Sequence, residues 1–195
     1  MPYINLEGQL PGITGLLEFR RDTAEPIRGL TQVLLRGPST LTEMERELIA
    51  TRVSAGNHCT FCATAHKAAV AAYCGGDDSI AREVISDIDQ APVSEKMKAL
   101  LEIADMVRVS GTAVTKNAVE KAKEKGASDL EIHDTVLIAA LFCMYNRYVD
   151  GLATSLPPQS SYYDALGERL KTRGYMRLKE GYDHIKKQNN EASAH

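Results

Sequence analysis

The sequence predicts an all-α protein, and three observations support this fold class. No segment alternates apolar and polar residues in the way that a half-buried strand does. Two capping boxes, Thr42–Glu45 and Ser128–Glu131, each lead into a segment with apolar residues at helical spacing. Glycine and proline lie between the segments, where helices end. We therefore expect a single helical domain over residues 1–195.

The N-terminal segment is rich in proline. Four prolines divide its short apolar patches, namely Pro2, Pro11, Pro26 and Pro38. This pattern predicts turns and short helices rather than a separate domain. We expect residues 1–40 to form an extension that wraps the core of the domain, at residues 41–155.

Two helices are expected next, at residues 42–55 and 58–73. Thr42 caps the first, and Gly56–Asn57 separates it from the second. The second is alanine-rich and ends at Gly75–Gly76. Together they form a predicted helical hairpin.

Six further helices are expected, and Ser94, Gly126 and the proline pair 157–158 mark some of their ends. The last two belong to a C-terminal helical extension over residues 156–195. The six ranges are 78–88, 94–109, 115–125, 128–154, 161–173 and 176–187.

Composition excludes several classes of function. The chain is 44% apolar, enough for a core, and its net charge is −3 with basic and acidic residues interspersed, so we expect no nucleic-acid partner. The longest apolar run, residues 136–144, is about half of what spans a bilayer, and no membrane association is expected. The N-terminus lacks the features of a secretory signal. These observations predict a soluble, cytoplasmic protein.

Cys59 and Cys62 open the second helix of the hairpin as a CxxC motif. In a reducing compartment such a pair is typical of redox or metal sites, not of a structural bridge. Residues three apart in a helix have Cα atoms about 5 Å apart, which a disulfide tolerates. The helix N-terminus also stabilises an anion, so we expect a lowered thiol pKa.

His66 lies four residues after Cys62, on the same otherwise apolar face of the helix. The two side chains are neighbours, and a proton could pass between them. A carboxylate on the preceding helix would complete a relay. Periodicity favours Glu47 slightly over Glu43 and Glu45.

This spacing of Glu47, Cys59, Cys62 and His66 resembles the core signature of the AhpD-like alkylhydroperoxidases, in the carboxymuconolactone decarboxylase superfamily. The match is close over residues 41–76, and the segment 146–151 also resembles the peroxidase-related branch. The resemblance implies an AhpD-like helical fold whose subunits form homo-oligomers.

By position, the resemblance implies that Cys62 is the peroxidatic thiolate, Cys59 the resolving thiol, and His66 with Glu47 the proton relay. The substrate would be a hydroperoxide, and an external dithiol would reduce the resulting disulfide. No cofactor and no metal are expected. The chain departs from well-known peroxidases of the family at Phe61, where they carry a histidine between the two cysteines.

Two alternatives remain open at this point. One is a decarboxylase-like lyase of the same superfamily, although those relatives do not use a cysteine pair. The other is a non-enzymatic oligomer that senses redox state or binds zinc, since Cys59, Cys62 and His66 supply three plausible ligands.

Outside the motif, Cys74 and Cys143 are interpreted as packing residues. Asn146, Arg147 and Asp150 interrupt an apolar helix. We interpret them as an Arg–Asp pair or a polar subunit interface rather than as substrate contacts.

Overall fold

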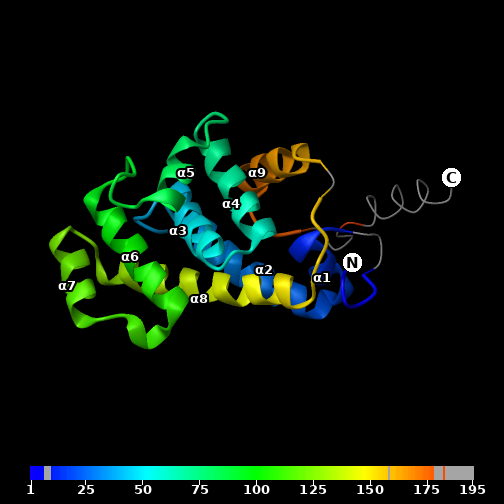
Figure 1. The fold of residues 1–195 in the computed structure, drawn as a ribbon, viewed down its shortest axis with the longest axis horizontal. Helices are drawn as coiled ribbons and strands as arrows, with labels where there is room; N and C mark the ends of the chain where they lie inside the picture. Colours follow the sequence, from blue (N-terminus) through cyan, green and yellow to red (C-terminus); the bar gives the residue numbers. More distant parts are fainter. Residues whose placement is uncertain (7–9, 158, 178–181, 183–195) are drawn as a thin grey trace.

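The computed structural model describes residues 1–6, 10–157, 159–177 and 182 (Figure 1). These residues form α-helices and one short 3₁₀ helix, without a strand among them, so the all-α prediction is confirmed. The helices are α1 (Gly12–Phe19), α2 (Arg21–Arg36), α3 (Glu43–Gly56), α4 (Thr60–Tyr73), α5 (Ser79–Ser86), α6 (Glu95–Val109), η2 (Gly111–Ala113), α7 (Lys116–Glu124), α8 (Asp129–Gly151) and α9 (Ser161–Arg173).

The longest helix, α8, runs along the molecule, and α3 and α6 pack on it (Figure 1). Its capping box is formed as predicted, because Ser128 and Glu131 exchange side-chain and backbone hydrogen bonds. Buried side chains on these three helices make up most of the main core, including Leu48, Leu100 and Phe142. This core holds α3 rigidly below the site.

The second capping box also forms, at Thr42 and Glu45 before α3. Only residues 57–59 separate α3 from α4, and the two helices pack against each other. On its other side α4 packs against α9, where a Cβ on Gly167 would meet the backbone oxygen of Ala68 at 2.4 Å. The absence of a side chain therefore lets α9 lie directly on α4.

The prediction of only turns and short helices before residue 38 is wrong for α2. This helix has 16 residues and contains Pro26. Proline removes one backbone hydrogen bond, but the helix buries one face at Ala24, Thr31, Leu34 and Leu35. Burial of that face outweighs the lost bond. α1 and α2 pack against α8, and the division into a core and two extensions stays a prediction.

The remaining helices lie close to their predicted ranges, with Ser94 capping α6 as expected. α8 ends at Gly151, three residues earlier than predicted. The helix expected at 176–187 falls mostly outside the described residues, and Met176 and Arg177, which are described, are not helical.

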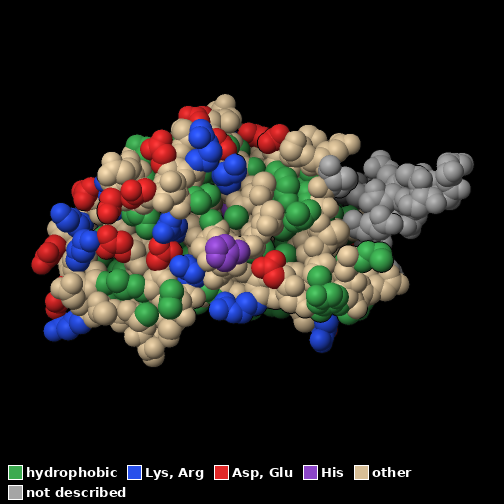
Figure 2. Space-filling model, in the orientation of Figure 1, with side chains coloured by type: hydrophobic (Ala, Val, Ile, Leu, Met, Phe, Trp, Pro, Cys, Tyr) green, Lys and Arg blue, Asp and Glu red, His purple; other side chains and the backbone are tan. Residues whose placement is uncertain are grey.

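No helix in the described part of the chain has both the length and the apolar character needed to cross a membrane. Figure 2 shows basic and acidic side chains mixed over the end of the molecule formed by α6 and α7. The face drawn there carries no continuous basic stripe.

Candidate active site

A tight turn between α3 and α4 places the cysteine pair. His58 has a left-handed backbone, with φ of 61°, and the backbone N–H of Cys59 donates to the carbonyl of Ser54 at 3.1 Å. Cys59 is the N-cap of α4 with an extended backbone, so Cys62 falls in the first turn. The turn thus presents both thiols at the start of the helix.

The two sulfur atoms lie 2.7 Å apart, and both thiols are free and buried. A disulfide bond is about 2.05 Å long, so a short movement of either side chain would bring the sulfurs to bonding distance. The surroundings are apolar, with Leu16, Phe61 and Val149 in the same cluster. The pair can therefore bond internally.

The pKa of Cys62 is raised, whereas the helix N-terminus led us to expect a lowered one. The hydrogen bond with Cys59 is the main cause, followed by burial and by the charge of Cys59. When two thiols lie this close, a negative charge on one disfavours ionisation of the other. These contributions act in the opposite direction to the effect expected from the helix N-terminus, so the lowered pKa predicted from the sequence is wrong.

His66 and Glu47 are brought together across the contact between α3 and α4. The Nδ1 atom of His66 lies 2.7 Å from Oε2 of Glu47, and Glu47 is fully buried. The other two candidate carboxylates are engaged elsewhere: Glu43 accepts from Tyr73, and Glu45 completes the capping box. A carboxylate at this distance fixes the hydrogen on Nδ1 and leaves Nε2 free to accept a proton.

Two residues that the sequence analysis missed complete the surroundings of Glu47. Arg36 donates to Oε1 at 2.5 Å, and the hydroxyl of Tyr175 donates to the same oxygen at 2.6 Å. Burial raises the pKa of Glu47, but the charge and hydrogen bond of His66, the charge of Arg36 and the Tyr175 bond outweigh it and lower the pKa to about 2. Glu47 is therefore ionised throughout the neutral range.

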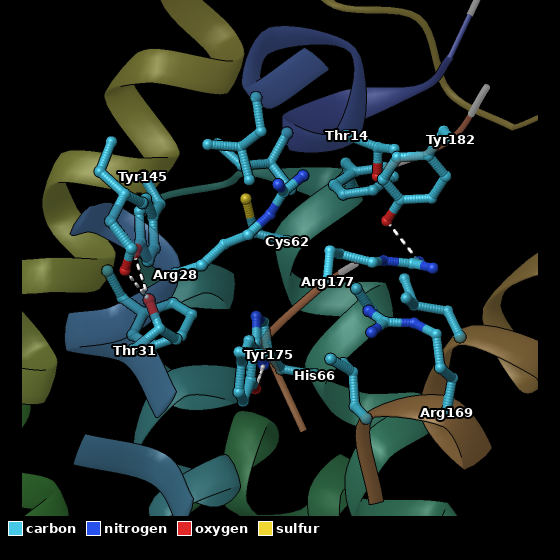
Figure 3. Close-up of a pocket in the computed structure, with 18 residues that line it drawn as sticks. Thr14, Arg28, Thr31, Cys62, His66, Tyr145, Arg169, Tyr175, Arg177 and Tyr182 are labelled. Atoms are coloured by element: carbon cyan, nitrogen blue, oxygen red, sulfur yellow. Dashed lines mark hydrogen bonds between the residues drawn. The ribbon is translucent and has the colours of Figure 1, made fainter. Parts of the chain in front are cut away.

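Cys62 and His66 open onto one cavity of about 90 Å³ (Figure 3). Its walls come from α1, α2, α4, α8, α9 and the segment after α9, and they are mostly apolar. Cys59 does not line this cavity. It borders a groove on another side, together with Lys67 and Arg82. Of the two thiols, Cys62 is the one that a small molecule in the cavity would meet.

Asn146 lies beside Cys62 and is almost fully buried. Its side chain hydrogen-bonds to Cys62, which acts to lower the thiol pKa, and it also donates to Ser54 and accepts from Asn57. The expected Arg147–Asp150 pair is not formed among the described residues. A polar residue inside the apolar run of α8 was the available signal for Asn146.

Phe61 packs against Tyr162 and Tyr163, with ring centroids 6.5 and 5.8 Å apart. A Cβ on Gly12, whose φ is +55°, would meet the Phe61 ring at 2.4 Å, so α1 closes over it. Phe61 thus forms part of the cavity wall where family peroxidases carry a histidine. Cys74 and Cys143 pack as expected, Cys74 against Met44 and Cys143 against Asn57.

Within the described residues, no group of three or more His, Cys, Asp or Glu side chains has an arrangement suited to a metal ion. The Nδ1 atom of His66 is engaged with Glu47.

The model of the carboxymuconolactone decarboxylase family matches residues 21–106, which span α2 to α6. A solved peroxidase-related protein from Silicibacter sp. TM1040 shares 25% identity and a TM-score of 0.70, with 80% of each chain covered. Over residues 21–106 the chain is thus similar to the carboxymuconolactone decarboxylase family. Its fold is that of AhpD-like, peroxidase-related proteins.

Two other solved proteins share the fold. A peroxidase-related protein with an alkylhydroperoxidase AhpD core, from Ralstonia eutropha JMP134, has 24% identity and a TM-score of 0.71 over 82% of each chain. A protein of unknown function from Agrobacterium tumefaciens, provisionally described as an AhpD antioxidant defence protein, has 20% identity and a TM-score of 0.66, over 82% of this chain and all of that one. No curated protein shows significant sequence similarity to this chain.

Proposed function

We propose that this protein is a thiol peroxidase that reduces organic hydroperoxides with the Cys59–Cys62 dithiol. One observation carries the proposal: two free sulfurs lie 2.7 Å apart, and the one that lines the cavity shares it with a histidine hydrogen-bonded to a buried carboxylate. A nucleophile, a base and a group orienting that base are the parts that such chemistry needs.

In the first step, His66 accepts the proton of the Cys62 thiol at Nε2, and the thiolate attacks the terminal oxygen of the hydroperoxide. The O–O bond breaks, Cys62 becomes a sulfenic acid, and the alkoxide takes the proton from His66 and leaves as an alcohol. Glu47 stays ionised and stabilises the charge on His66. The sulfur is oxidised by two electrons, and the peroxide is reduced by two.

In the second step, the Cys59 thiol attacks the Cys62 sulfur. The S–O bond breaks, a disulfide forms, and water leaves with the proton of Cys59. An external dithiol then reduces the disulfide, is itself oxidised to a disulfide, and returns two protons to the pair. The external dithiol is needed because the described residues supply no second dithiol.

The raised pKa of Cys62 has a consequence for the rate. Since the thiol and not the thiolate prevails at neutral pH, the reactive fraction increases about tenfold for each unit of pH until the pKa is reached. We expect the rate of Cys62 oxidation by peroxide to rise steadily with pH above 7.

The test is peptide mapping by mass spectrometry after one equivalent of tert-butyl hydroperoxide is added to the reduced protein. We expect a disulfide between residues 59 and 62. Cys62→Ser should abolish peroxide consumption, Cys59→Ser should stop at one turnover, and His66→Ala should slow oxidation at least tenfold. Cys74→Ser is the matched control and should behave as wild type. Full activity in Cys62→Ser would exclude this mechanism.

A further inference from the structure

Three arginines line the cavity that contains Cys62, and two of them have no acidic partner among the described residues. Arg28 pairs with Glu18, at 3.4 Å. Arg169 on α9 and Arg177 just after it form no ion pair with a described carboxylate. Figure 3 shows the side chains of Arg169 and Arg177 next to each other at the cavity.

The hydrogen bonds of these two arginines leave part of each guanidinium unused. Arg169 donates from Nη1 to the backbone oxygen of Gly174 at 3.1 Å, and Arg177 donates from Nη2 to the hydroxyl of Tyr182 at 2.5 Å. Arg177 also stacks over the ring of Tyr182, 3.9 Å from its centroid. The Nε atoms of both arginines are buried and have no hydrogen-bond partner among the residues that the structure describes.

Arg169 and Arg177 are each only partly exposed, so solvent screens the repulsion between their neighbouring guanidinium charges incompletely. Burial and the adjacent positive charge of Arg177 lower the pKa of Arg169, although Tyr182 partly offsets this. An unpaired buried donor destabilises the folded protein, and more so when the group is charged. A bound anion would relieve both the repulsion and the unpaired donors.

The remaining lining of the cavity limits what this anion can be. Ile13, Leu17 and Phe142 are among its apolar wall residues. The cavity is small, at about 90 Å³. A small molecule with a short apolar body and one anionic group fits these walls better than a long lipid does.

We propose that Arg169 and Arg177 bind the carboxylate of the substrate, which is a small organic hydroperoxide carrying that carboxylate on a short apolar body. The hydroperoxide end then lies at Cys62 and His66, across the same cavity. This inference rests on the proposed peroxidase function for the reactive end, whereas the carboxylate site is defined by the arginines alone.

Binding can be tested without any turnover, by isothermal titration calorimetry of the reduced protein with hexanoate and with the matched neutral alcohol 1-hexanol. We expect hexanoate to bind at least tenfold more tightly. Arg169→Gln and Arg177→Gln should each weaken hexanoate binding at least fivefold and leave hexanol binding unchanged. The control is Arg173→Gln, an exposed arginine at the end of α9, which should change neither.

Equal binding of hexanoate and hexanol, or hexanoate binding that survives both substitutions, would overturn the carboxylate site. Retention of hexanol binding in the variants shows that the cavity is still folded. The result therefore does not depend on whether the variants keep peroxidase activity.

A second measurement separates this inference from the proposed function. Tert-butyl hydroperoxide and an analogue carrying a carboxylate on a short chain are compared as substrates. We expect a KM at least tenfold lower for the analogue at similar kcat, with the difference lost in Arg177→Gln. Hexanoate binding without consumption of either peroxide would remove the peroxidase function and leave the carboxylate site. Consumption of both peroxides with equal KM values, without hexanoate binding, would remove the carboxylate site and leave the peroxidase function.

Discussion

Glu47 carries a negative charge in a fully buried position, and three donors hold it there. His66, Arg36 and Tyr175 together outweigh the cost of burial. Because the pKa of Glu47 falls from 4.5 to about 2 on folding, ionisation of this group favours the folded state. That contribution is complete above pH 4.5 and is lost as the pH falls through 2. The contacts that hold Glu47, the residue that orients His66, therefore also stabilise the fold.

At the residue scale, Glu47→Gln should make the free energy of unfolding less dependent on pH in the acidic range. The wild-type protein should lose on the order of 3 kcal/mol of unfolding free energy through Glu47 between pH 4.5 and 2. At pH 7 the variant should have a lower free energy of unfolding than the wild type, since Arg36 loses its buried partner. It should not show the further decrease between pH 4.5 and 2. Urea unfolding at a series of pH values measures both. Glu43→Gln, on the same helix, should keep the wild-type slope, and an unchanged slope in Glu47→Gln would contradict the argument.

At the element scale, the site depends on how closely α9 packs against α4. α4 carries Cys62 and His66, while α9 and the residues after it carry Arg169 and Tyr175. Gly167 permits the contact, because any side chain there would meet the backbone of Ala68. A side chain at this single position would separate the two halves of the cavity.

Gly167→Ala should therefore destabilise the protein by about 1–3 kcal/mol and lower the rate of peroxide reduction. Glycine to alanine in a helix is otherwise stabilising by roughly 0.5–1 kcal/mol, so the sign of the change identifies the contact. Gly29→Ala is the matched control, because a Cβ there meets nothing within 4 Å. Denaturant unfolding of both variants is the measurement. A gain of stability in Gly167→Ala would show that α9 adjusts without cost.

At the scale of the whole molecule, several large apolar side chains are exposed on the surface of the single subunit. Leu30 and Val33 lie three residues apart on α2, and Phe19 and Met144 are exposed on α1 and α8. Residues three apart on a helix share a face. Contact with a second subunit would cover such side chains, and we propose that α2 contributes to a homo-oligomer.

The mass of the protein in solution, measured by light scattering after gel filtration, should exceed that of one chain. Leu30→Glu together with Val33→Glu should shift the protein toward the monomer, because two charges would be buried at the contact. Glu substitutions at Lys116 and Lys125, both outside this face, serve as controls and should leave the mass unchanged. A wild-type monomer would exclude the proposed association.

The amino-acid sequence by itself determined the helices and the local part of the site. Capping boxes, glycine ends and the spacing of Cys59, Cys62 and His66 act over three or four residues, so they can be recognised without a fold. Where local rules compete with packing they fail, as at Pro26, which lies inside a 16-residue helix because one face of that helix is buried.

Only the tertiary structure decided which groups surround the reactive pair. Tyr175, Arg169 and Arg177 lie about 100 residues after the motif, and Arg36 lies on the helix before α3. No periodicity links any of the four to the motif. The direction of the Cys62 pKa was also decided by packing, since the close Cys59 and burial raise it. Distances and burial across elements set these energies, and a local sequence pattern contains neither.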